Sequence, residues 1–172
     1  MKKETPWILA GAFLLFAWVA GCSVVAVVLW ERNNPFSSKA SSNPADYKIK
    51  FGLVTVDADE NATFSKETDV VPLRYKDSGF RFGFQITPPD ERPYSFHCIY
   101  HFPSPPKILS GDSFESTVPS TTMQTKEMEV PGGTFVSGSW FDPGDPLGEQ
   151  SIDVFINGKF AKTIKFTVIP DH

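Results

Sequence analysis

Apolar and polar residues alternate most regularly between residues 80 and 87. Phe80, Phe82, Phe84 and Ile86 are separated by Arg81, Gly83, Gln85 and Thr87. This period of two predicts a β-strand with one buried face. Six further stretches, each bounded by Pro, Gly or Asp clusters, also predict strands: 47–56, 95–102, 126–130, 134–141, 151–156 and 160–169. About seven strands at this spacing predict an all-β fold, an antiparallel β-sandwich.

The last two predicted strands flank Asn157-Gly158, a strong signal for a β-hairpin. A two-residue turn would oppose Ile152 to Thr163, whereas a three-residue turn with Gly158 in a left-handed bulge would oppose Ile152 to Lys162. We favour the bulged turn, because its register collects six apolar side chains on one face. These side chains are Ile152, Val154, Phe160, Ile164, Phe166 and Val168.

An uncharged, largely apolar run at residues 7–30 follows Lys2 and Lys3. As a helix it would be about 36 Å long at roughly 1.5 Å per residue, enough to cross a hydrocarbon core of about 30 Å. The basic pair places residues 1–6 in the cytoplasm by the positive-inside rule, and the rest of the chain outside. The run therefore predicts an uncleaved signal anchor, a single transmembrane helix with Trp7 and Trp30 at the membrane interfaces.

The same run has a second interpretation, as the signal of a lipoprotein. Val19-Ala20-Gly21-Cys22 resembles a lipobox, in which the cysteine is lipidated after cleavage, so that the signal would end at residue 21. Against this interpretation, the chain stays apolar from Cys22 to Trp30, whereas a lipoprotein tether is normally polar. Both interpretations place the following domain on the same side of the membrane.

Residues 31–46 are rich in Ser, Asn and Pro and predict a flexible tether. Residues 47–172 are numerous enough for one exported domain with its own core. From residue 45 onward the chain has twelve basic and eighteen acidic residues. This balance disfavours nucleic acid as a partner, because phosphate binding requires a basic surface. We expect a domain in the periplasm, or otherwise outside the cytoplasmic membrane, whose partner is an envelope protein or ligand.

Three segments of the exported region resemble a known family. They are Gly-Phe-Arg-Phe-Gly-Phe-Gln-Ile-Thr-Pro at 79–88, Tyr-His-Phe-Pro at 100–103, and Trp140-Phe141-Asp142 with Pro146 and Gly148 before the closing hairpin. Residues 47–169 are similar to a group of exported bacterial proteins known only as a domain of unknown function. The resemblance implies an immunoglobulin-like sandwich and carries no catalytic assignment.

His97, Cys98 and His101 are residue types that bind zinc. On a strand, however, the two histidines lie on one face about 13 Å apart, at roughly 3.3 Å per residue, while Cys98 points to the other. We therefore predict no metal site, and a buried Cys98 that is not a catalytic nucleophile. Its strand face is predicted to be shared with Phe96, Tyr100 and Phe102.

The acidic segment 57–63 carries oxygen ligands at alternate positions, as a calcium loop does at its start. Ala62 stands where such a loop needs glycine, and Thr68 where it needs a bidentate glutamate, so we interpret the segment as an acidic surface loop. The sequence has no Gly-x-Ser-x-Gly elbow, phosphate loop or dinucleotide fingerprint. We expect neither an enzyme nor a cofactor, the alternative being an envelope hydrolase or inhibitor with a dispersed site.

Two connections are stiffened by proline, at 102–107 and 141–148. Rigid loops lose little conformational entropy on binding, so these connections are the candidate partner surface of a binding or assembly module of the cell envelope. The alternative is that the prolines only end strands and protect sheet edges. The candidate residues are Ser104, Pro105, Pro106, Phe141, Asp145 and Leu147.

Overall fold

The computed structural model describes residues 43–57, 61–75, 79–109 and 113–171. The predicted anchor, the lipobox cysteine Cys22 and most of the predicted tether lie outside these ranges. Within them, no helix is long and apolar enough to span a membrane. A short 3-10 helix, η1 (Pro44–Asp46), precedes the strands, and the side chain of Asn43 caps it by accepting a hydrogen bond from the backbone N–H of Ala45.

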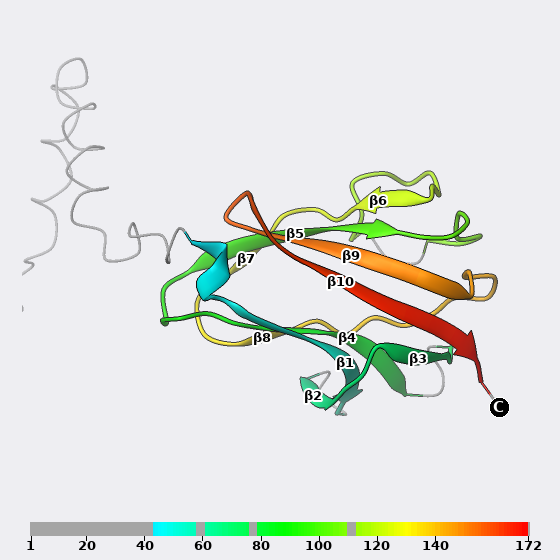
Figure 1. Ribbon diagram of the computed structural model, residues 1–172, viewed down its shortest axis with the longest axis horizontal. Coiled ribbons are helices and arrows are strands. Elements are labelled where there is room, and N and C mark those ends of the chain that lie inside the picture. Colours follow the sequence, from blue (N-terminus) through cyan, green and yellow to red (C-terminus); the bar gives the residue numbers. More distant parts are fainter. Residues whose placement is uncertain (1–42, 58–60, 76–78, 110–112, 172) are drawn as a thin grey trace, which may run out of the picture. The chain divides into compact units, whose positions relative to one another are not determined.

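Two β-sheets form the two layers of a sandwich (Figure 1). Sheet A has the strand order β2-β1-β4-β8, and sheet B has the order β3-β10-β9-β5-β6, with β7 also paired to β5. The strands of sheet A are β1 (Lys48–Val56), β2 (Ala62–Glu67), β4 (Phe80–Thr87) and β8 (Phe135–Val136). Those of sheet B are β3 (Val70–Leu73), β5 (Tyr94–His101), β6 (Thr122–Gln124), β7 (Met128–Val130), β9 (Gly148–Ile156) and β10 (Lys159–Pro170).

The chain crosses between the sheets after β2, β3, β4, β7 and β8, so that strands adjacent in sequence often lie in different layers. Such crossing connections are typical of immunoglobulin-like sandwiches. The predicted all-β sandwich is confirmed, but its described part has ten strands rather than about seven, and β3 pairs with β10 in parallel. Sequence reasoning missed β2, β3 and β6. The first has no buried residue, and the other two have only four and three residues.

The core lies between the inner faces of the two sheets. Phe82, Phe84 and Ile86 of β4 are at most 6% exposed, which confirms the buried face that their alternation predicts. The ring of Phe84 crosses the layer to Phe96 of β5 in an edge-on contact, with 5.9 Å between ring centroids. Each buried Phe contributes about 1.5–3 kcal/mol of hydrophobic stabilisation relative to an exposed one, so these contacts hold the sheets together.

The closing hairpin differs from the predicted bulged turn. Asn157 and Gly158 form a two-residue turn with φ angles of 50° and 73°, the left-handed pair that a tight hairpin requires. A bulge then falls between Phe160 and Lys162, which sets Ile152 opposite Ile164. The predicted register is therefore wrong. Five of the six apolar side chains predicted to share one face are nevertheless buried. The sixth, Phe160, is 55% exposed, because the bulge that shifts the register lies beyond it.

Candidate functional site

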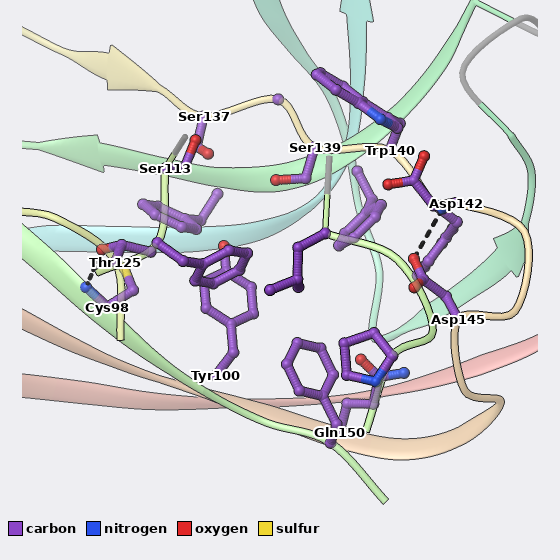
Figure 2. A pocket seen from close by; sticks show the side chains of 18 of the residues that line it. Cys98, Tyr100, Ser113, Thr125, Ser137, Ser139, Trp140, Asp142, Asp145 and Gln150 are labelled. Atoms are coloured by element: carbon purple, nitrogen blue, oxygen red, sulfur yellow. Dashed lines mark hydrogen bonds between the residues drawn. The ribbon is translucent and has the colours of Figure 1, made fainter. Parts of the chain in front are cut away.

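The inner faces of the two sheets do not close against each other along the edge that β8 and the β6–β7 segment form. A cavity of about 530 Å³ lies there, between residues 135–141 on the side of sheet A and β5 on the side of sheet B (Figure 2). The connection from β5 to β6 supplies a further wall through Pro106, Leu109 and Phe114. Ile108 and Met128, which are 50% and 46% exposed, line it where it meets solvent.

Aromatic rings are prominent in the lining, which includes eight Phe, one Tyr and one Trp. Tyr100 stands in the middle of the cavity, with Phe114 edge-on at 5.7 Å and Phe102 stacked at 6.0 Å between ring centroids. Phe135 packs against Phe96 at 4.9 Å. Rings in this arrangement offer an apolar surface with defined faces and edges. The cavity is therefore suited to an apolar group of a ligand.

A few polar groups interrupt the apolar lining. Two of them are Ser139 and Tyr100, which both line the cavity. Burial, together with the nearby Cys98, raises the pKa of the Tyr100 hydroxyl above its ordinary value, so that it is neutral at physiological pH. A neutral phenol and a serine can exchange hydrogen bonds with a ligand, but neither is a strong base. This pair therefore favours binding over proton abstraction.

One end of the cavity is acidic. The backbone N–H of Asp142 donates to a carboxylate oxygen of Asp145 at 2.8 Å, and the backbone N–H of Asp145 donates to the carbonyl of Asp142 at 3.0 Å. Burial raises the pKa of Asp145, the hydrogen bond from Asp142 lowers it, and the charge of Asp142 raises it again. Gln150 fixes the following turn by donating to the carbonyl of Pro146 at 2.7 Å. Two carboxylates are thus held at one end of an aromatic cavity.

Cys98 lies on the cavity wall and is 1% exposed, which confirms its predicted burial. Burial raises the pKa of its thiol to about 12, so the thiolate is scarce at neutral pH. Its backbone is fixed by Thr125, whose hydroxyl accepts from the Cys98 N–H at 2.9 Å. These observations describe a wall residue rather than a nucleophile.

The two histidines of the same strand lie on the opposite face of sheet B. His97 stacks on Phe155 of β9, with 4.8 Å between ring centroids. His101 Nε2 lies 2.9 Å from an oxygen of Asp153, and hydrogen bonds from Thr163 and then His101 lower the pKa of that carboxyl. Sequence reasoning missed this cluster, because its members come from three strands. In the part of the chain that the structure describes, no three His, Cys, Asp or Glu residues gather as metal ligands.

The acidic segment 57–63 is described only at its ends. There the carboxylate of Asp57 accepts hydrogen bonds from the backbone N–H of Asn61 at 2.9 Å and from its side-chain amide. The Asp57 oxygens therefore close the turn between β1 and β2.

The predicted partner surface separates into two groups. Pro106, Phe141 and Asp145 line the cavity, with Pro106 and Phe141 buried and Asp145 half-buried. The other three residues are exposed and lie outside the lining: Ser104, Pro105 and Leu147. The two proline-rich connections do meet at one site, but as walls of a cavity. Tyr100, Phe114 and Ser139 were missed, because nothing in their local sequence shows that they converge.

Similar solved structures share only a distant likeness with this chain. A crystal structure of an immunoglobulin-like protein from Pseudomonas aeruginosa has a TM-score of 0.46 and 19% identity, over 71% of this chain and 92% of that protein. The alkylpurine DNA glycosylase AlkC from Pseudomonas fluorescens, bound to DNA containing an abasic site analog, has a TM-score of 0.33 and 14% identity. That match spans 72% of this chain and 30% of the glycosylase. At these scores neither structure bears on function.

No curated protein is similar enough in sequence to count as a relative. A family model, in contrast, matches most of the domain. Residues 49–169 fit the PM0630 beta sandwich domain, a match that covers well over half of the chain and agrees with the resemblance expected from the sequence. The chain therefore belongs to the PM0630 beta sandwich domain family.

Proposed function

We propose that this domain is a binding module and that the aromatic cavity is its ligand site. The observation that carries the proposal is the cavity itself. Protein interiors are close-packed and leave few voids larger than a water molecule, whereas this opening measures about 530 Å³. That volume lies in the range of ligand pockets, roughly 300–1,000 Å³, and its apolar lining with few polar groups has the usual composition of such pockets.

A hydrolase with a dispersed site is the alternative function. The polar groups of the cavity do not favour it, because no histidine is among the described residues that line the cavity beside Ser139, and the buried Tyr100 phenol is neutral. The ligand is accordingly bound rather than transformed, and the site needs no cofactor.

We further propose that the module acts outside the cytoplasmic membrane, as part of the cell envelope. Lys2, Lys3 and the apolar run at 7–30 support this location, with an uncleaved anchor as the first interpretation and lipidation at Cys22 as the second. Protease added to spheroplasts is expected to digest the domain while cytoplasmic marker proteins stay intact. A domain protected until the membrane is dissolved would contradict the proposed location.

Binding in the cavity can be measured with N-phenyl-1-naphthylamine, an uncharged apolar dye that fluoresces when it leaves water. The solubilised chain is expected to bind one dye molecule, and Ser139→Trp, which places an indole in the cavity, is expected to weaken binding about tenfold or more. Ser104→Trp is the control, because Ser104 is exposed and lies outside the lining.

Thermal melting would show whether Ser139→Trp remains folded. A second variant, Ile108→Asp, leaves the fold intact because Ile108 is 50% exposed, and its charge at the cavity opening is expected to weaken dye binding as well. Equal dye affinity in the unaltered chain and in both cavity variants would show that the dye binds elsewhere. That result would remove the cavity as the ligand site.

A further inference from the structure

One wall of the cavity is the end of a sheet. β8 is the last strand of sheet A, and its extension through residues 137–139 continues the pairing with β4. The N–H of Ser137 donates to the carbonyl of Phe84 at 2.9 Å, and the N–H of Ser139 donates to the carbonyl of Phe82 at 2.7 Å. Because hydrogen-bonding directions alternate along a strand, the backbone groups of Val136 and Gly138 point away from β4.

This outward edge borders the cavity. Val136 and Gly138 both belong to the lining, and among the described residues no strand other than β4 pairs with β8. A row of outward N–H and C=O groups is a template on which another extended chain can pair. Ser137 and Ser139 point from the same segment into the cavity (Figure 2). A strand added at this edge would likewise direct every second side chain inward, because side chains alternate between the two faces.

We propose that the ligand is an extended polypeptide segment that pairs with β8 as an additional strand and inserts alternate apolar side chains into the cavity. This inference rests on the proposed function, whose site it shares. The spacing agrees with it. A new strand would lie about 4.8 Å from β8, and its inward side chains would follow one another at about 6.6 Å, so that two of them could reach the aromatic lining.

The charge of the site indicates one more property of the segment. The strand edge runs from Phe135 toward Asp142, so Asp142 and Asp145 lie where one end of an added strand would emerge. A basic residue at that end would meet the half-buried carboxylate of Asp145, where opposite charges attract more strongly than in water. The expected ligand is therefore an apolar, alternating segment with a Lys or Arg at one terminus.

The test uses the solubilised full-length chain and a library of acetylated octapeptides. In each peptide Phe, Leu or Val alternates with Thr, and a single Lys stands at the first or the last position, which covers antiparallel and parallel pairing. Some members are expected to bind, to displace N-phenyl-1-naphthylamine and to slow hydrogen exchange at the amides of Val136 and Gly138. N-methylation of the peptide amides that face β8 is expected to weaken binding about fivefold or more.

Gly138 offers a matched pair of variants. Gly138→Pro removes an N–H that points away from β4, a position where an edge strand tolerates proline, and is expected to weaken peptide binding about fivefold relative to Gly138→Ala. Gly138→Ala keeps the N–H, and its added Cβ would meet no atom closer than 3.5 Å, so it is the reference variant that adds a side chain at this position without losing the N–H.

The outcomes separate the two proposals. If the dye binds but no peptide of the library does, the strand-pairing inference is wrong and the cavity remains a ligand site. Peptide binding that is unchanged by Gly138→Pro and by N-methylation would also overturn strand pairing, since the side chains alone would then hold the peptide. If neither the dye nor any peptide binds to the unaltered chain, the proposed function itself is wrong.

Discussion

Replacing Gly83 with alanine is expected to lower the free energy of unfolding by about 2–4 kcal/mol. A Cβ at this position would lie 2.0 Å from the carbonyl oxygen of Ser137 and 2.9 Å from its carbonyl carbon. Those atoms belong to the backbone, so relief requires movement of the segment that pairs with β4. The movement would break the hydrogen bonds that Ser137 and Ser139 donate to β4, and with them the wall of the cavity.

Urea denaturation measures this loss, and dye binding reports whether the cavity survives. Gly138→Ala is the control, because Gly138 lies on the paired segment opposite Gly83 and its added Cβ would make only ordinary contacts, the nearest at 3.5 Å. Its effect is expected to stay within about 1 kcal/mol. Equal stability of the two variants would mean that the close approach at Gly83 does not constrain the wall.

Replacing Phe141 with alanine is expected to lower the free energy of unfolding by about 3–5 kcal/mol. Phe141 is 3% exposed and stacks on Phe82, with 4.3 Å between ring centroids and 14° between ring planes. Its removal deletes buried apolar area and leaves a void that the surrounding sandwich fills only in part. Urea denaturation measures the change in stability.

Leu147 belongs to the same proline-rich connection and is 45% exposed, so Leu147→Ala is expected to change stability by no more than about 0.5 kcal/mol. Both residues belong to the partner surface predicted from the sequence, and the comparison shows which of them is a core residue rather than a contact residue. A loss below about 1 kcal/mol for Phe141→Ala would show that the stacked ring does not anchor the connection. Phe141 would then remain only a contact residue, as the sequence predicts.

The strongest strands could be predicted because each carries its own pattern. The alternation in β4 and the apolar positions of β5, β9 and β10 indicate one buried face, because residues two apart in a strand lie on the same side of the sheet. β2 gives no such signal, because none of its residues is buried and it is held by pairing with β1. The hairpin turn could be located from Asn157-Gly158, but its register depends on a bulge at residue 161 that only packing against the other sheet selects.

The sequence by itself determined that the domain is an all-β sandwich, that Cys98 is buried, and that two stiff connections flank the strands. Local alternation, strand-face geometry and proline content carry that information. Only the tertiary structure decided that β5, residues 106–109 and 113–114, and the 135–146 segment enclose one cavity, and that the edge of β8 away from β4 borders this cavity. The reason is physical: these walls come from segments far apart in the chain, and their convergence depends on how two sheets pack rather than on any local pattern.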